Sequence, residues 1–211
     1  MMKRVTFLLI SLFIGASVMG QTKLNAQQQE QVLQKINVAT ASMKTMQCDF
    51  VQTKKIKLMK KEMVSSGVMY YDSPNKLRWQ YNKPYVYVFV LNKEKVSLKS
   101  SKTTQTIDVK ENKMFRQLSN IILNSVTGGH LKSSAEFEVE IWNRNNIYSA
   151  LLIPKKKELK KLYKSIEISF NASLTMVETV KMVETTGDIT SVTLKNAKVN
   201  LPIRESLFNV N

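Results

Sequence analysis

The strongest constraint on the fold is a series of short apolar segments, separated by turn residues, that continues from residue 49 almost to the end of the chain. Pro74 and Pro84 lie in two of the turns, where proline removes a backbone donor and favours chain reversal. The connections are too short for the crossovers that parallel strands need, so the pattern predicts antiparallel hairpins. We expect about eleven strands, near residues 49–58, 63–71, 77–82, 85–91, 95–100, 105–110, 137–142, 147–153, 165–171, 176–185 and 189–199.

Two segments have helical spacing. In residues 25–46 apolar side chains recur at steps of three and four, and Asn25 with Gln28 is typical of a capped helix start. Residues 112–126 show the same spacing and are followed by the helix-ending Gly128-Gly129 pair. Since no linker, low-complexity tract or internal repeat interrupts the chain, we expect a mainly β fold with helices (α+β), built as one curved antiparallel sheet with two helical segments.

The first twenty residues resemble an export signal. Lys3 and Arg4 precede an apolar stretch that is too short to span a bilayer comfortably, and Gly20 is a small residue suited to cleavage. We therefore expect residues 1–20 to be a signal peptide and residues 21–211 a single domain. The alternative is an uncleaved anchor or a buried core helix.

The chain is strongly basic, with a formal net charge of +16 from 32 Lys and Arg against 16 acids. Many lysines fall in two clusters, at residues 54–61 and 155–164. Export argues against nucleic acid as the partner and favours transient contact with anionic membrane surfaces, for which Lys155, Lys156 and Lys157 are the candidates. Equally, these lysines could be solvated turns that keep strand edges from pairing.

Catalytic and metal-binding chemistry has little support in the residues. His130, the one histidine, lies in a Gly-Gly-His turn, and Cys48 is the one cysteine, so a typical zinc site cannot be built. Glu136, Glu138 and Glu140 alternate along a strand, a spacing typical of a solvated face. We expect no enzyme activity and no cofactor, and a buried, inert thiol at Cys48, with a reactive thiol as the alternative.

Recognition of apolar ligands has more support. Residues 85–91 contain only Tyr, Val, Phe and Leu, so both faces of that strand should meet apolar surroundings. Period-two alternation also puts Leu77, Trp79 and Tyr81 on one face of the preceding strand, without deciding whether that face lines a cavity or the core. A sandwich or barrel packed solid would explain the same residues.

Several segments, taken in order, resemble the LolA family of lipoprotein carriers. These are Phe50-Val51-Gln52, the strand around Gly67, Pro74-Asn75 followed by Trp79, Lys83-Pro84 and an ending with Leu201-Pro202 and Leu207-Phe208. The resemblance covers essentially the whole of residues 21–211. Where the family often has an Arg before the Pro-Asn pair, this chain has Ser73, so the lid-closing role of that Arg is not carried over to Ser73, nor to Arg78.

The resemblance implies an incomplete, strongly curved antiparallel β-barrel with a helical lid over an apolar cavity. It also implies a monomeric periplasmic carrier, a lipoprotein cargo released at the inner membrane, and an acceptor at the outer membrane. The candidates for the acyl cavity are Phe50, Leu77, Trp79, Tyr81, Val86, Val88 and Val90, and those for the lid are Phe115, Leu118, Ile121 and Ile122.

Two further functions fit the same residues. The chain could carry another lipid, such as a phospholipid or glycolipid. It could instead be a non-transport β-module that binds envelope proteins or polyanions through its lysines. Identifying the ligand that co-purifies with the protein would distinguish between these functions.

Overall fold

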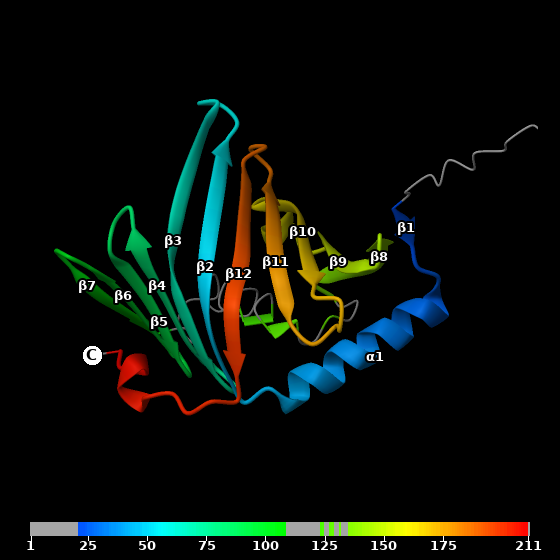
Figure 1. The fold of residues 1–211 in the computed structure, drawn as a ribbon. Helices are drawn as coiled ribbons and strands as arrows, with labels where there is room; N and C mark the ends of the chain where they lie inside the picture. The colour runs from blue at the N-terminus through cyan, green and yellow to red at the C-terminus, as the bar shows by residue number, and fades with distance from the viewer. Residues whose placement is uncertain (1–20, 109–122, 125–126, 129–130, 132–134, 211) are drawn as a thin grey trace, which may run out of the picture.

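The fold is a single 12-stranded antiparallel sheet accompanied by a few helices (Figure 1). A computed structural model describes residues 21–108, 123–124, 127–128, 131 and 135–210. The strand order is β1-β8-β9-β10-β11-β12-β2-β3-β4-β5-β6-β7, so two neighbouring pairs, β1–β8 and β12–β2, join strands that are distant in sequence. The pairing of β2 with β12 joins the N-terminal and C-terminal halves into one surface.

The elements have the following bounds. The strands are β1 (Thr22–Lys23), β2 (Thr45–Ile56), β3 (Lys61–Asp72), β4 (Lys76–Lys83), β5 (Tyr87–Asn92), β6 (Lys95–Ser100), β7 (Thr104–Asp108), β8 (Phe137–Arg144), β9 (Ile147–Pro154), β10 (Tyr163–Phe170), β11 (Val177–Glu184) and β12 (Ile189–Val199). The helices are α1 (Ala26–Ser42), α3 (Lys157–Lys160) and the 3₁₀ helix η1 (Glu205–Phe208), and residues 123, 124 and 127 are also helical.

All eleven predicted strands are confirmed, with ends shifted by up to four residues. The β8–β9 turn shows why sequence reasoning succeeded here. Asn145 and Asn146 both have positive φ, at 51° and 64°, as a two-residue hairpin turn of matching twist requires. The short strand β1 was not predicted, because two residues are too few to show an alternation.

Helix α1 begins as predicted but ends earlier. The Asn25 side chain accepts a hydrogen bond from the Gln28 N–H, and the Gln28 side chain accepts one from the Asn25 N–H, which completes a capping box. The predicted end at residue 46 is wrong, because α1 ends at Ser42 and Met46 lies on β2. Met43 and Met46 continue the apolar spacing of the helix, but they are buried in the core from the cap and the strand.

The two faces of the sheet are covered by different parts of the chain. The core face, which carries Met46, Cys48 and Phe50 on β2, joins the largest apolar cluster, to which Val32 and Ile36 of α1 also belong. In Figure 1, α1 crosses below the strands β8–β12. The helix therefore supplies its apolar stripe to the core face.

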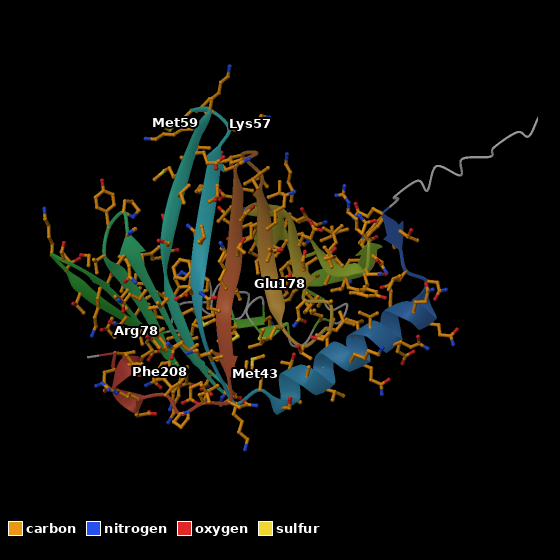
Figure 2. The ribbon with its side chains drawn as sticks, viewed as in Figure 1. Met43, Lys57, Met59, Arg78, Glu178 and Phe208 are labelled. Carbon is orange, nitrogen blue, oxygen red and sulfur yellow. The ribbon has the colours of Figure 1, made fainter. Side chains whose placement is uncertain are left out.

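The opposite face is covered by the C-terminal residues 203–210, and we call it the tail face. There Phe208, fully buried, packs in one cluster with Val88 and Val90 of β5. The tail is also tied down by hydrogen bonds, since the Asn92 amide donates to the Phe208 carbonyl at 3.0 Å and the Arg78 Nη1 donates to the Leu207 carbonyl at 3.2 Å. Figure 2 shows Arg78 and Phe208 near each other at the end of the sheet away from Lys57 and Met59.

The predicted mainly β, antiparallel fold with few helices is confirmed. The sheet is open, because no pairing joins its edge strands β1 and β7 among the described residues. Strong curvature around a cavity and closure by a helical lid stay predictions.

Candidate functional site

Three aromatic rings form a cluster on the core face, and we call them the aromatic floor. Phe50 on β2 packs against Trp79 on β4 with ring centroids 4.4 Å apart, and against Tyr81 with centroids 5.1 Å apart, in an edge-to-face arrangement. These rings meet across β3 because Gly67, which pairs with both Phe50 and Tyr81, has no side chain to separate them. Alternation thus places three of the predicted cavity residues together.

The aromatic floor extends toward the β5–β6 edge. The register pairs Tyr81 with Tyr87, and Trp79 with Phe89, which in turn pairs with Leu98. All of these side chains lie on the core face and are only partly buried, Tyr87 being 37% exposed. Leu77, the fourth predicted cavity residue on this face, is fully buried and pairs with Tyr71 and Leu91. Aromatic and aliphatic surface therefore remains accessible beside the packed core.

A polar rim lies at one side of the aromatic floor. The Tyr81 hydroxyl donates to the Gln52 Oε1 at 2.9 Å, and burial raises the pKa of that hydroxyl. Two residues beyond Gln52, the Lys54 ammonium lies 2.9 Å from the Glu184 carboxylate of β11. Burial, followed by the Glu184 charge, raises the pKa of Tyr163. The core face thus changes from apolar to hydrogen-bonding over a few residues of β2.

The Trp79 indole adds a polar donor inside the apolar surface. Its Nε1 is buried and has no hydrogen-bond partner that meets the usual geometry, although the indole lies close enough to the Tyr81 hydroxyl to lower the pKa of that hydroxyl. A buried N–H without a full partner costs free energy. An acceptor on a bound molecule would remove that cost.

The remaining predicted cavity residues are placed elsewhere. Val88 and Val90 lie on the tail face against Phe208, and Val86 precedes β5 and is 59% exposed. The structure therefore divides the seven predicted residues between two faces and a loop. The expectation that both faces of residues 85–91 meet apolar surroundings holds for residues 88–91, where the C-terminal residues cover one face. It does not hold for Tyr85, Val86 and Tyr87, which are exposed.

The predicted lid residues Phe115, Leu118, Ile121 and Ile122 lie outside the described residues, as does His130. The described part of the same segment confirms a helix end. Gly128 has a φ of 70°, and its N–H donates to the Asn124 carbonyl at 2.8 Å, as in a helix C-terminus capped by glycine. Leu123 packs against the core cluster and Leu131 belongs to it, so residues on both sides of Gly128 adjoin the core face.

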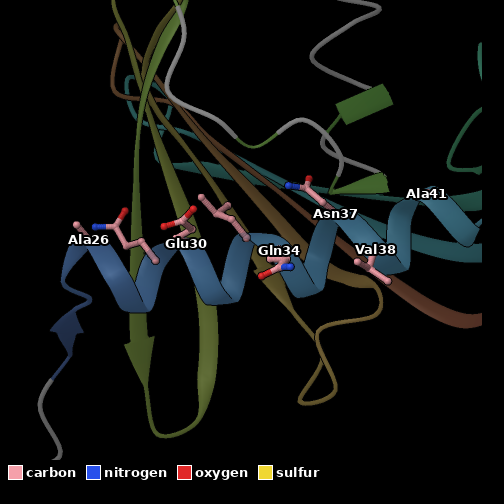
Figure 3. A pocket seen from close by; sticks show the side chains of 8 residues that line it. Ala26, Glu30, Gln34, Asn37, Val38 and Ala41 are labelled. Carbon is pink, nitrogen blue, oxygen red and sulfur yellow. The ribbon is translucent and has the colours of Figure 1, made fainter.

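A hollow of about 750 Å³ lies along α1. Its volume is in the range that holds drug-sized ligands. The described residues that line it all belong to α1 and include both apolar and polar types: Ala26, Gln29, Glu30, Leu33, Gln34, Asn37, Val38 and Ala41. Figure 3 shows these side chains along the helix. None of the seven predicted cavity residues is among them, although Leu33 also packs against the core cluster.

The membrane-surface candidates lie in the β9–β10 connection. The Lys156 ammonium is 2.6 Å from the Glu136 carboxylate, the Lys155 N–H donates to the Glu136 carbonyl, and Lys157 begins α3. Part of the positive charge at this position is therefore balanced locally.

Two of the three acids singled out in the sequence, Glu136 and Glu140, contact basic or polar groups. Glu140 is bonded to Lys23 and to the Trp142 indole, and the Lys23 hydrogen bond lowers the pKa of Glu140. In the part of the chain that the structure describes, no three His, Cys, Asp or Glu side chains are grouped as a metal site would require, and no helix is long and apolar enough to cross a membrane.

A family profile identifies the fold. The profile described as "Outer membrane lipoprotein carrier protein LolA" matches residues 41–211, which include β2 to β12 and the whole aromatic floor. The chain belongs to the LolA family. A comparison with curated protein sequences found no match.

Solved structures with the same fold are distant in sequence. The crystal structure of MucB matches with a TM-score of 0.52 and 8% identity, covering 89% of this chain and 64% of the MucB chain. An uncharacterized conserved protein from Thermus thermophilus matches with a TM-score of 0.50 and 8% identity, covering 86% of this chain and 93% of its own. A LolA superfamily protein from Nitrosomonas europaea has a TM-score of 0.47 and 7% identity, over 85% of this chain and 96% of its own. At such identities the likeness shows the fold alone.

The structure shows where Arg78 and Ser73, the two positions considered for the family's lid-closing arginine, lie in this LolA-family member. Arg78 lies on the tail face, where its Nη2 donates to the Gln80 Oε1 at 2.8 Å and burial lowers the pKa of the guanidinium. Ser73 lies in the β3–β4 turn and its N–H donates to the Lys44 carbonyl at 2.8 Å. Arg78 therefore anchors the C-terminal residues, on the face opposite the aromatic floor.

Proposed function

We propose that this protein is a periplasmic, non-enzymatic carrier that binds the acyl chains of lipoproteins on its core face and moves them from the inner to the outer membrane. The observation that carries the proposal is the aromatic floor. Phe50, Trp79 and Tyr81 lie together with Tyr87 and Phe89, and the outer members of the group are only partly buried. Membership of the LolA family supports lipoprotein transport as the purpose of this surface.

The energetics fit a carrier better than a storage site. Burying about fifteen methylenes contributes on the order of 12 kcal/mol against water, which holds a chain firmly during transit. A membrane or an acceptor offers similar burial, so handover needs only a small gradient in affinity. In this proposal the curved sheet and its predicted helical lid cover the bound acyl chain. The partners are an inner-membrane release complex, which supplies the cargo, and an outer-membrane acceptor, which receives it.

The polar rim would hold the glycerol or peptide end of the cargo. Gln52, Lys54 and Glu184 offer donors and acceptors beside the apolar surface, and the Trp79 N–H could donate to an ester carbonyl. A site that is apolar at one side and hydrogen-bonding at the other suits a molecule with an apolar acyl chain and a polar head. Another lipid with this division remains the second candidate.

A binding assay with a fluorescent long-chain fatty acid tests the proposal. The mature protein, stripped of lipid, should bind the probe at micromolar concentration, and Tyr87→Glu should weaken binding about tenfold or more, because it puts a charge against the acyl chain. Tyr85→Glu is the matched control, since Tyr85 is 80% exposed and precedes β5. The proposal fails if the parent binds no long-chain probe, or if the two variants bind it equally. Mass spectrometry of co-purified ligand then separates an acylated protein from a free lipid.

A further inference from the structure

The two lysine clusters, which are about a hundred residues apart in sequence, meet at one end of the sheet. The strand directions bring the β2–β3, β9–β10 and β11–β12 connections to the same end. Hydrogen bonds join neighbouring connections there, because the Lys57 N–H donates to the Asp188 Oδ1 at 3.0 Å and the Thr185 N–H donates to the Leu162 carbonyl at 3.1 Å. The lysines thus share one surface.

The β2–β3 hairpin ends in exposed apolar side chains, and Figure 1 shows it projecting beyond the neighbouring hairpins. Leu58 is 94% exposed and Met59 is 63% exposed, and Figure 2 places Met59 and Lys57 at its tip. Leu58 and Met59 remain in water in the folded protein, so they contribute no burial energy to folding. Turns of this kind usually carry charged or polar residues, which water solvates well. The tip therefore has the composition of a contact surface.

Lysines surround this apolar pair. Lys57, Lys60 and Lys61 are exposed and form no ion pair among the described residues, unlike Lys54, Lys55 and Lys156, which each face a glutamate. Unbalanced positive charge around protruding apolar side chains is complementary to a bilayer with anionic headgroups and an apolar interior.

We propose that the β2–β3 hairpin is a membrane-docking element, in which Leu58 and Met59 enter the outer part of an anionic bilayer while Lys57, Lys60 and Lys61 contact its headgroups. The lysines of the β9–β10 connection lie on the same end and add to the attraction at longer range. This element does not depend on the carrier function, although it would serve one.

A feature of the hairpin links the two proposals. Met63, which is 44% exposed, lies on the core face, because it pairs with Lys54, four residues along β2 from Phe50. One apolar side chain therefore lies on the core face between the tip and the aromatic floor, beside the polar rim. With the tip in a bilayer, the core face would begin a few residues from the lipid.

Vesicle flotation of the mature protein tests the docking element. We expect the protein to float with vesicles of phosphatidylglycerol and phosphatidylethanolamine, and far less with phosphatidylcholine alone. Lys57→Gln with Lys60→Gln and Lys61→Gln should lower partitioning on the order of a hundredfold at low salt. Leu58→Ser with Met59→Ser should lower it about tenfold or more, with little dependence on salt.

Two matched controls keep the test specific. Lys35→Gln with Lys181→Gln and Lys195→Gln removes the same charge from exposed positions elsewhere, and Val199→Ser with Leu201→Ser removes apolar surface from the opposite end of β12. Both should float nearly as the parent does. If the parent floats with neither vesicle, or if the tip variants float as well as their controls, the proposal is wrong, and an acidic protein surface becomes the partner to test.

An environment-sensitive fluorophore on Leu58→Cys measures insertion directly. Cys48 is buried, so labelling is confined to the new thiol. The emission should shift to the blue with anionic vesicles and be quenched by a lipid-soluble quencher, whereas the same fluorophore on Leu201→Cys should not respond. Water-like emission at Leu58→Cys while the protein floats would overturn the insertion. Acyl-probe binding by the tip variants should equal that of the parent, so failure of the carrier proposal is measured separately.

Discussion

Phe50 on β2 and Trp79 on β4 pack with their ring centroids 4.4 Å apart, although strand β3 lies between their own strands. The contact depends on what β3 presents at that point. Gly67 pairs with Phe50 on one side and with Tyr81 on the other, so the rings close over a position that has no side chain. The aromatic floor is therefore a property of three adjacent strands and a missing Cβ.

Gly67→Ala should destabilise the fold by more than about 3 kcal/mol. A Cβ at this position would lie 1.8 Å from the Gln80 carbonyl oxygen, which is backbone and cannot move without disturbing the β3–β4 ladder. Urea unfolding measures the loss. Ser66→Ala, one residue away on the same strand, is the control and should change stability by less than about 1 kcal/mol. Equal stability of the two variants would mean that the strands separate more easily than the packing indicates.

Phe208→Ala should cost about 3–5 kcal/mol, because it removes a fully buried ring from the tail face and leaves a cavity beside Val88 and Val90. Thermal unfolding measures the cost, and Ser206→Ala, an exposed neighbour in η1, should be nearly neutral. If the variant folds, its acyl-probe binding should match the parent's, since Phe208 and the aromatic floor lie on opposite faces. Loss of probe binding in a folded Phe208→Ala would move the ligand site to the tail face.

Cys48 should make stability fall at high pH. Burial, followed by the neighbouring Asp49 charge, raises the pKa of its thiol from an ordinary value of 9.0 to about 12. Between those values the unfolded chain has lost the proton and the folded chain retains it, so stability decreases as pH rises from about 9 to about 12. Urea unfolding of the parent and of Cys48→Ala across this range isolates the contribution, because lysines and tyrosines titrate in both. Parallel curves would show that the thiolate is accommodated in the fold.

The same burial predicts a slow reaction of the folded protein with thiol reagents. The reactive species is the thiolate, which is scarce at pH 8 when the pKa is about 12. We expect iodoacetamide to modify Cys48 only after urea unfolds the chain, with a single-cysteine Leu58→Cys, Cys48→Ala protein as the reactive comparison. Rapid modification of the folded parent would identify the reactive thiol that was the alternative prediction.

Strand positions were predictable because the signals are local. Alternation, proline turns and the paired asparagines at residues 145–146 act within one hairpin, and the Asn25 capping box acts within one helical turn. The end of α1 was not predictable, because Met43 and Met46 keep a helical spacing although the helix ends at Ser42 and Met46 lies on a strand. There the buried pairing of β2 with β3 and β12 prevails over local periodicity.

The candidate site was predictable only in part, for a related reason. Alternation correctly grouped Leu77, Trp79 and Tyr81, but it does not say what covers each face. Val88 and Val90 are as apolar as Phe89, and only the docking of Phe208, more than a hundred residues later, distinguishes them. Similarly, the pairing of Lys54 with Glu184 and the meeting of the two lysine clusters follow from long-range strand order.

Substituting either member of the Lys54–Glu184 ion pair at the polar rim should shift the pKa of Tyr163, and the two shifts should have opposite directions. Burial raises the pKa of the Tyr163 hydroxyl, the Glu184 carboxylate raises it further, and the Lys54 ammonium lowers it. Glu184→Gln should therefore lower the pKa of Tyr163, because a nearby negative charge no longer opposes ionisation. Lys54→Gln should raise it, because a nearby positive charge no longer favours ionisation.

Ultraviolet titration at the tyrosinate band, with Tyr163→Phe in each background to subtract the other tyrosines, measures both shifts. The effect on stability should be small, about 0–1 kcal/mol, because both side chains are partly exposed and solvent screens the pair. Shifts in the same direction, or none, would show that Lys54 and Glu184 do not act on Tyr163 through their charges. Opposite shifts would establish that the rim holds one cation and one anion close to a phenol that burial keeps protonated. This combination donates and accepts hydrogen bonds at the edge of the aromatic floor, and it is what the polar end of an acylated cargo would require there.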